Sequence, residues 1–345
     1  FTPAPECGGT IVVAGQEVPF GTDLVFSCRE MPEFSFGCEI CEDLWVPAPP
    51  SVRLAEAGAM IICNLSASDE LIGKAEYRRN LCSMQSAKCV CAYVYSDAGS
   101  GESSTDMVFS AHNIITENGK VLSESEIFGD GIAVADVDIG FLEHERTKLF
   151  NYDIKCEEGY QYIDSVSNIN TDRVERDYEK TPFVPADKGE LEKRINLITD
   201  IQAEGLLRRV KHTQAKSLVV GVSGGLDSTL ALLIAARAMD KLNRKRKDIL
   251  AISMPCFGTT ERTKSNAEIL SEQLGVTFRE IDITDSVRSH FKDIGQNEKV
   301  TDVTYENSQA RERTQVLMDI ANKNGGLVVG TGDLSELALG WATYN

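Results

Sequence analysis

The fold is set by residues 217–228, Ser217-Leu218-Val219-Val220-Gly221-Val222-Ser223-Gly224-Gly225-Leu226-Asp227-Ser228. Residues 217–222 have the continuous apolar character of a buried strand, and residues 229–239 have helical spacing. Two glycines between them let the backbone approach a ligand without a Cβ clash, and the following helix directs unpaired N–H groups at an anion. The stretch therefore predicts a phosphate-binding loop.

Polar side chains of this loop indicate what it binds. Ser223 and Ser228 add hydroxyl donors, whereas Asp227 would repel phosphate unless a cation lay between them. This favours Mg²⁺ beside a pyrophosphate. The alternative is an ordinary Gly-Gly turn before a capped helix, but six suitable residues between a strand and a helix make that the weaker interpretation. No Gly-Lys-Ser/Thr follows, so the loop is not of the Walker type.

Outward from the loop, residues 191–345 alternate between strands and helices. Further strands are expected at residues 249–254, 276–281 and 327–330, and the helices include residues 264–274 and 307–322. This order predicts a parallel sheet with a ligand at the carboxyl ends of its strands.

Residues 1–150 show a different order of predicted strands and helices. Strands are expected at residues 10–14 and 59–64, a helix at residues 75–90, and a hairpin closed by Asn118-Gly119. This mixture predicts an α/β sandwich. Acidic, weakly periodic residues 151–190 are interpreted as the connection between the two domains.

Three motifs in the second domain carry a resemblance to a known family. The loop resembles that of the N-type ATP pyrophosphatases, Ser-Gly-Gly-x-Asp-Ser. The segment from Asn307 to Arg313 is similar to Asn-x-x-Ala-Arg-x-Arg of NAD synthetases, and the segment from Gly330 to Glu336 is similar to their Gly-Thr-x-x-x-x-Glu. The resemblance implies a Rossmann-like sheet of the adenine nucleotide α-hydrolase type.

The resemblance also assigns roles to residues. ATP would be bound by Ser223, Gly224, Gly225, Asp227, Ser228 and Thr331, the substrate by Asn307 and Arg311, and Mg²⁺ by Asp227 and Glu336. The implied chemistry is adenylation of deamido-NAD by ATP, followed by displacement of AMP by ammonia. A solvated, charged helix start at Asn307 and a capping box of Asp333 with Glu336 are the structural alternatives, and the capping box is compatible with metal binding.

The first domain resembles the nitrilase-like glutaminase of glutamine-dependent NAD synthetases. Its nucleophile turn is similar to residues 39–45, Glu39-Ile40-Cys41-Glu42-Asp43-Leu44-Trp45, and residues 46–51, 64–68 and 101–106 also fit that family. The resemblance implies that the Cys41 thiolate attacks the glutamine amide and that Ser68 binds glutamine. The alternative for Cys41 is an inert buried cysteine.

The sequence also departs from that family. The Glu and Lys of the nitrilase catalytic set would lie upstream of Cys41, in segments that residues 1–345 lack, and no motif assigns Lys74 or Lys88 to that role. The second domain similarly stops before the family's last substrate-binding residues. We therefore expect residues 1–345 alone not to hydrolyse glutamine.

Composition limits the classes of partner. The formal net charge of −18 argues against nucleic acid, and no apolar stretch approaches a membrane span. Ten cysteines in a chain with a large core favour reduced thiols and a cytoplasmic location, although Cys38, Cys41, Cys89 and Cys91 leave structural zinc open. The resemblance implies a homo-oligomer. The rival functions are an amidotransferase for XMP or aspartate and a non-catalytic nucleotide- or metal-binding module.

Overall fold

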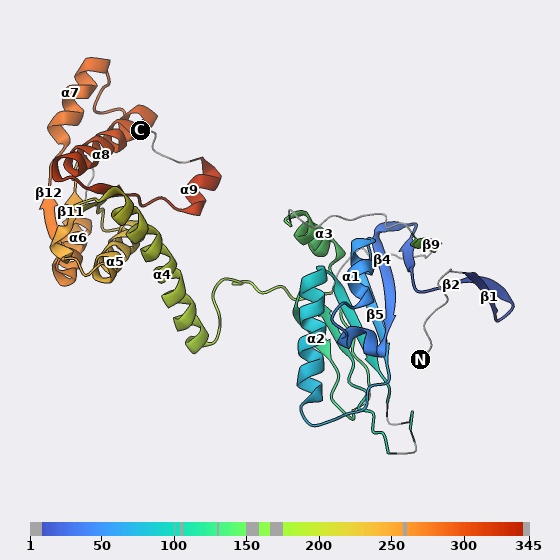
Figure 1. Cartoon of the computed structure of the whole chain (residues 1–345). Coiled ribbons are helices and arrows are strands. Elements are labelled where there is room, and N and C mark those ends of the chain that lie inside the picture. Colours follow the sequence, from blue (N-terminus) through green and yellow to red (C-terminus); the bar gives the residue numbers. More distant parts are fainter. Residues whose placement is uncertain are drawn as a thin grey trace. The chain divides into compact units, whose positions relative to one another are not determined.

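A computed structural model describes residues 9–99, 101–103, 106–129, 131–149, 159–165, 175–257 and 261–340. The chain divides into two compact units, Phe1–Tyr178 and Glu179–Asn345 (Figure 1). Both units combine strands and helices, so the α/β class is confirmed. No described helix is both long and apolar enough to cross a membrane.

The first unit contains two sheets and the helices α1 to α3. Its elements are β1 (Gly9–Val13), β2 (Gln16–Phe20), β3 (Leu24–Cys28), β4 (Met31–Ile40), η1 (Cys41–Trp45), α1 (Pro50–Glu56), β5 (Ile61–Ser66), α2 (Lys74–Cys89), β6 (Ala92–Asp97), β7 (Ile114–Glu117), β8 (Lys120–Glu124), α3 (Ile139–Thr147) and β9 (Gln161–Ser165).

Seven of these strands form one mixed sheet in the order β8-β7-β6-β5-β4-β3-β9, while β1 and β2 form a separate ribbon. Strands β4, β5 and β6 are parallel neighbours, so their carboxyl ends meet at one edge. Helices α1 and α2 pack on one face of this sheet, where Leu54, Ile62, Cys82, Tyr93 and Ile114 belong to a buried cluster. Strand β9 pairs with β3, so the segment interpreted as the connection contributes a strand to the first unit.

The predicted hairpin is confirmed. Strands β7 and β8 pair antiparallel, with Glu117 opposite Lys120. Asn118 and Gly119 both have positive φ, 44° and 88°, as a two-residue turn between twisted strands requires. An added Cβ on Gly119 would also lie 3.1 Å from the Cβ of Ala87.

The second unit is built around a parallel sheet. Its elements are α4 (Lys188–Thr213), β10 (Leu218–Gly221), α5 (Leu226–Lys241), η2 (Arg246–Asp248), β11 (Ile249–Ser253), α6 (Glu261–Leu274), β12 (Thr277–Glu280), α7 (Thr284–Ile294), α8 (Val303–Asn324), β13 (Leu327–Val329) and α9 (Leu334–Leu339).

Four parallel strands form this sheet in the order β12-β11-β10-β13, as the alternation of strands and helices predicts. Apolar side chains on its two faces belong to different clusters. Val220 and Ala251 pack with residues of α5 and α6, while Val219 and Ile252 pack with residues of α7 and α8. Covering both faces explains why these strands read as continuous apolar runs.

Candidate functional site

The predicted phosphate loop lies between β10 and α5, as expected. Gly224 has a φ of +80°, which only glycine adopts without strain, and Gly225 is the N-cap of α5. Ser228 is buried, and its hydroxyl donates to the carbonyl oxygen of Gly225 at 3.1 Å and lies 3.3 Å from Ser223 Oγ. The backbone N–H of Gly225 also donates to Ser223 Oγ at 3.3 Å. These contacts fix the loop around the exposed start of α5.

The second predicted ATP segment emerges beside this loop. Strand β13 pairs with β10 in parallel, with Val329 opposite Val220, so Thr331 and the phosphate loop follow neighbouring strands at the same sheet edge. Asp333 and Glu336 form the capping box of α9: Asp333 Oδ1 accepts from the Glu336 N–H at 2.8 Å, and Glu336 Oε2 accepts from the Asp333 N–H at 3.3 Å.

The two acidic residues assigned to Mg²⁺ are both exposed, and carboxylate oxygens are the ligands that Mg²⁺ prefers. Asp227 lies in the first turn of α5, and Glu336 keeps one carboxylate oxygen outside the capping box. Among the described residues, no hydrogen bond joins Asp227 to Glu336. Two carboxylates fit Mg²⁺, which usually retains waters and binds substrate phosphates, although the described part contains no group of three acidic, His or Cys ligands.

The assigned substrate residues lie on the first turns of α8. Asn307 and Arg311 are exposed and four residues apart on this helix. Helix α8 packs against β10, and an added Cβ on Gly221 would come within 3.0 Å of Leu317. The Nε of Arg313 lies 3.5 Å from the carbonyl oxygen of Met254, just after β11.

In the first unit, Cys41 follows β4 directly and begins η1. Its φ is +52°, an unusual backbone conformation for a non-glycine residue. Asn64 on the neighbouring strand β5 holds this turn, because its Oδ1 accepts from the Cys41 N–H at 3.1 Å. The Cys41 side chain is partly exposed, so Cys41 is not a fully buried core cysteine.

A buried polar network that the sequence did not predict supports this turn. The hydroxyl of Tyr93 donates to Glu39 Oε1 and accepts from Asn64 Nδ2 at 3.0 Å. The second oxygen of Glu39 accepts from the Ser51 N–H at 2.7 Å. Burial raises the pKa of the Glu39 carboxyl, and the hydrogen bonds from Tyr93 and Ser51 oppose that rise. The sequence signal that could have indicated this network is Glu39, a charged residue between Cys38 and Ile40 at the end of β4.

We expect Tyr93→Phe to destabilise the first unit by about 2 kcal/mol near neutral pH, because it removes a donor from a buried carboxylate. The folded pKa of Glu39 already exceeds its unfolded value, so Glu39 costs stability as pH rises through the folded pKa. The Tyr93 hydroxyl lowers the pKa of Glu39, so its loss raises the folded pKa further and makes the ionised carboxylate more unfavourable in the folded state. The destabilisation should therefore be larger at pH 8 than at pH 4. The destabilisation is measured by urea unfolding at both pH values, with amide hydrogen exchange in peptides of β4, β5 and β6 as the probe.

The matched control is Tyr77→Phe, which keeps the ring stacked on Trp45 with centroids 5.4 Å apart and removes an exposed hydroxyl. It should change stability by less than about 0.5 kcal/mol. An equal loss in both variants, or a Tyr93→Phe loss that does not grow with pH, would contradict the role of this hydroxyl.

Ser68 lies just beyond β5 and is buried. Its N–H donates to Asp97 Oδ1 at 2.9 Å, and Asp97 ends the neighbouring strand β6. The structure therefore brings Cys41 and Ser68 to the same edge, after the adjacent parallel strands β4 and β5. Burial raises the pKa of Asp97, whereas the Ser68 N–H and the Arg78 guanidinium lower it.

The four cysteines of the zinc alternative do not form a metal site. Cys38 is exposed and lies opposite Cys63 in the register of β4 and β5, whereas Cys89 and Cys91 are buried with the core cluster under α2. No group of three potential ligands occurs in the described part of the chain. A hydrogen bond with Cys63 lowers the pKa of Cys38 to about 7.

Comparisons with known proteins cover both units. Residues 198–345 match the NAD synthase family. The chain is 47% identical to the glutamine-dependent NAD(+) synthetase of Mycobacterium bovis, covering 97% of this chain and 52% of that protein. It is 44% identical to the glutamine-dependent NAD(+) synthetase of Mycobacterium leprae, covering 100% of this chain and 53% of that protein.

Among solved structures, the glutamine-dependent NAD+ synthetase from Acinetobacter baumannii in complex with ADP is 23% identical, with a TM-score of 0.42; the match covers 99% of this chain and 53% of that one. The chain thus spans about half the length of the curated relatives that it matches. At 44–47% identity over nearly its whole length, it is a homologue of the glutamine-dependent NAD(+) synthetases, with an NAD synthase segment at residues 198–345.

Proposed function

We propose that the protein containing this chain is a glutamine-dependent NAD synthetase, which uses ATP to convert deamido-NAD to NAD. The observation that carries the proposal is the glycine-rich loop at residues 223–228, which follows β10 at the same sheet edge where Thr331 follows β13. The similarity to mycobacterial synthetases supports the choice of substrate.

The nicotinate carboxylate of deamido-NAD must first be activated, because oxide is a poor leaving group. It attacks the α-phosphorus of ATP, and the bond to pyrophosphate breaks. The exposed N–H groups at the start of α5 and the hydroxyl of Ser223 would bind the departing pyrophosphate. Mg²⁺ held by Asp227 and Glu336 would supply further positive charge there. Ammonia then displaces AMP and leaves the amide.

Asn307 and Arg311 are proposed to bind deamido-NAD. They share one face of α8, and the guanidinium of Arg311 suits a phosphate or carboxylate. A homo-oligomer in the cytoplasm is the state we propose for the whole protein, from the resemblance of its sequence to this family.

The first unit would supply ammonia from glutamine. The thiolate of Cys41 would attack the amide carbonyl, forming a thioester and releasing ammonia, and water would then cleave the thioester to glutamate. Ser68 would bind glutamine. The Cys41 thiol also needs a base and an oxyanion partner, and no motif in residues 1–345 assigns them.

The test uses protein expressed from the complete open reading frame. With ATP, Mg²⁺ and either glutamine or ammonium, we expect stoichiometric NAD, AMP and pyrophosphate from deamido-NAD, and none of this turnover with XMP or aspartate. Pyrophosphate release with XMP or aspartate but not with deamido-NAD would reject the proposal. ATP binding without any turnover would favour a non-catalytic nucleotide-binding module.

A further inference from the structure

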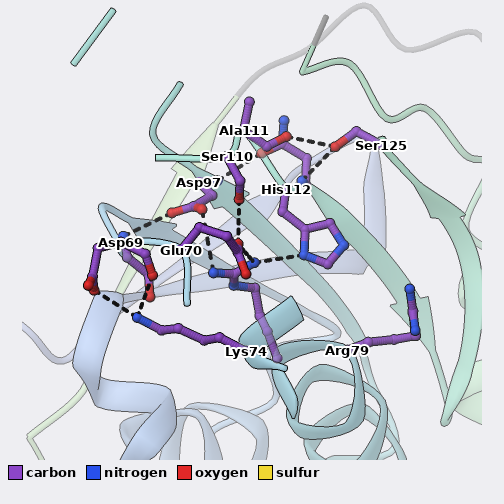
Figure 2. Close-up of polar contacts among 12 residues, drawn as sticks. Asp69, Glu70, Lys74, Arg79, Asp97, Ser110, Ala111, His112 and Ser125 are labelled. Carbon is purple, nitrogen blue, oxygen red and sulfur yellow. Dashed lines mark hydrogen bonds and ion pairs between the residues drawn. The ribbon is translucent and has the colours of Figure 1, made fainter. Parts of the chain in front are cut away.

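A buried guanidinium lies beneath the segment that carries Ser68. Arg78, in α2, is completely buried. Its Nη1 lies 3.0 Å from Glu70 Oε2 and 2.7 Å from His112 Nδ1, and its Nη2 lies 3.8 Å from Asp97 Oδ2. Figure 2 shows Glu70, Asp97 and His112 near one another in this cluster. A buried charge without a counter-charge is strongly unfavourable, so these groups depend on one another.

The histidine in this cluster adds no charge in this arrangement. Arginine has no acceptor, so Nδ1 of His112 accepts from Arg78 and the ring proton lies on Nε2. That proton is donated to Glu124 Oε1 at 2.5 Å. Glu124 is in turn held by Arg79, whose Nε and Nη2 donate to it at 2.6 to 3.0 Å. Glu70 and Asp97 are therefore the two carboxylates that face Arg78.

Both carboxylates hold the segment between β5 and α2, residues 67–73. Asp97 Oδ1 accepts from the Ser68 N–H at 2.9 Å. Glu70 belongs to the segment itself: its N–H donates to the carbonyl oxygen of Val108 at 2.7 Å, and its carboxylate accepts from Ser110 Oγ at 2.7 Å. The Arg78 guanidinium lies beside both carboxylates, Glu70 and Asp97, that hold residues 67–73 in place.

We propose that Arg78 is a positioning residue for glutamine: it fixes Ser68 at the sheet edge beside Cys41 through Asp97 and Glu70, without touching the substrate. The inference rests on the proposed glutaminase role of this unit. Arg78 acts on where Ser68 lies, so its loss weakens glutamine binding more than the chemical step at Cys41.

The kinetic test uses the protein from the complete open reading frame. Arg78→Met is expected to raise the KM for glutamine about tenfold or more, with kcat for glutamine hydrolysis within about threefold of wild type. Arg78→Lys, which keeps the charge but lacks the fork of donors, should give an intermediate KM. NAD formation driven by ammonium should be unchanged in both variants.

Arg79→Met is the matched control. Arg79 lies next to Arg78 in the same helix and makes a bidentate ion pair with Glu124, which contacts His112 of the Arg78 cluster but makes no hydrogen bond to the segment of residues 67–73 in the part of the chain that the structure describes. It should leave the KM for glutamine unchanged. Arg78→Met combined with Asp97→Asn should raise KM by less than the product of the two single effects, because both act through one interaction.

Amide hydrogen exchange tests the positioning independently of activity, and it also detects a variant that fails to fold. In Arg78→Met, peptides covering residues 67–70 should exchange faster than in wild type and in Arg79→Met, while peptides of β5 and β6 remain protected. Unchanged exchange at residues 67–70 would overturn the proposal, as would faster exchange with an unchanged KM. If wild-type protein makes NAD from ammonium but never hydrolyses glutamine, the glutaminase part of the proposed function fails, and the exchange result still decides whether Arg78 positions Ser68.

Discussion

Replacing Cys41 with alanine is expected to reduce glutamine-dependent NAD formation at least about 10³-fold, while formation driven by ammonium remains at the wild-type rate. The thiol is the group that would form the thioester, so no other side chain substitutes for it. Its position supports this role: it follows β4 in a left-handed backbone conformation and is held by Asn64. Glutamate release and NAD formation are measured in the same protein from the complete open reading frame.

Cys38 provides the matched control, and the control is necessary. Its hydrogen bond with Cys63 lowers the pKa of the Cys38 thiol to about 7, so we expect Cys38 to react with alkylating agents, although it lies three residues before the proposed nucleophile. Loss of activity on alkylation therefore cannot identify Cys41. Cys38→Ala should keep glutamine-dependent activity. If Cys38→Ala abolished it and Cys41→Ala did not, the nucleophile would have been assigned wrongly.

The second unit could be predicted from local sequence because its central strands, β10 and β11, are buried between helices on both faces of the sheet. Residues 217–222 and 327–330 were read as strands from continuous apolar runs, and they became β10 and β13. Helix α7 was not predicted, because most of its residues are exposed and only Val287 and Phe291 are buried. Burial produces the apolar pattern, so elements with little buried surface carry a weak signal.

The first unit was harder to read because its contacts are distant in sequence. The ten-residue strand β4 was not predicted, since Pro32, Glu33 and Glu39 interrupt its apolar pattern. Glu39 is buried there because Tyr93, 54 residues later, donates to it. Strand β9 similarly lies in an acidic segment without periodicity and depends on its pairing with β3. Such pairings are properties of the fold, which no local window contains.

Among the candidate site residues, those in short motifs could be predicted from the sequence, whereas the residues that support them could not. Motif residues such as Ser223, Ser228 and Cys41 were recognised because their roles depend on short spacings. The supporting residues were not, because Arg78 sits in a helix whose other charged residues are mainly solvated, and neither its spacing nor its residue type distinguishes it from Arg79. Only the tertiary structure shows that one of these neighbouring arginines is completely buried and the other is not.

Replacing Gly224 with alanine is expected to lower NAD formation about 100-fold or more with both glutamine and ammonium as nitrogen donors. At a φ of +80° an alanine is strained by about 1 kcal/mol or more, and the loop can relieve this only by moving the groups around it. The new Cβ would also project from a segment whose backbone must approach a pyrophosphate closely. Loss with both donors separates this effect from that of Cys41→Ala, which affects glutamine alone.

Gly205→Ala is the matched control for this substitution. Gly205 lies within α4, where an added Cβ would meet no atom within 4 Å, and alanine is favoured over glycine in a helix interior by about 1 kcal/mol. Gly205→Ala should therefore retain activity and slightly stabilise the second unit. Pyrophosphate release and ATP binding are measured for both variants. If Gly224→Ala bound ATP and released pyrophosphate as wild type does, residues 223–228 would not be the site of ATP cleavage, and the proposed synthetase function would lose the observation that carries it.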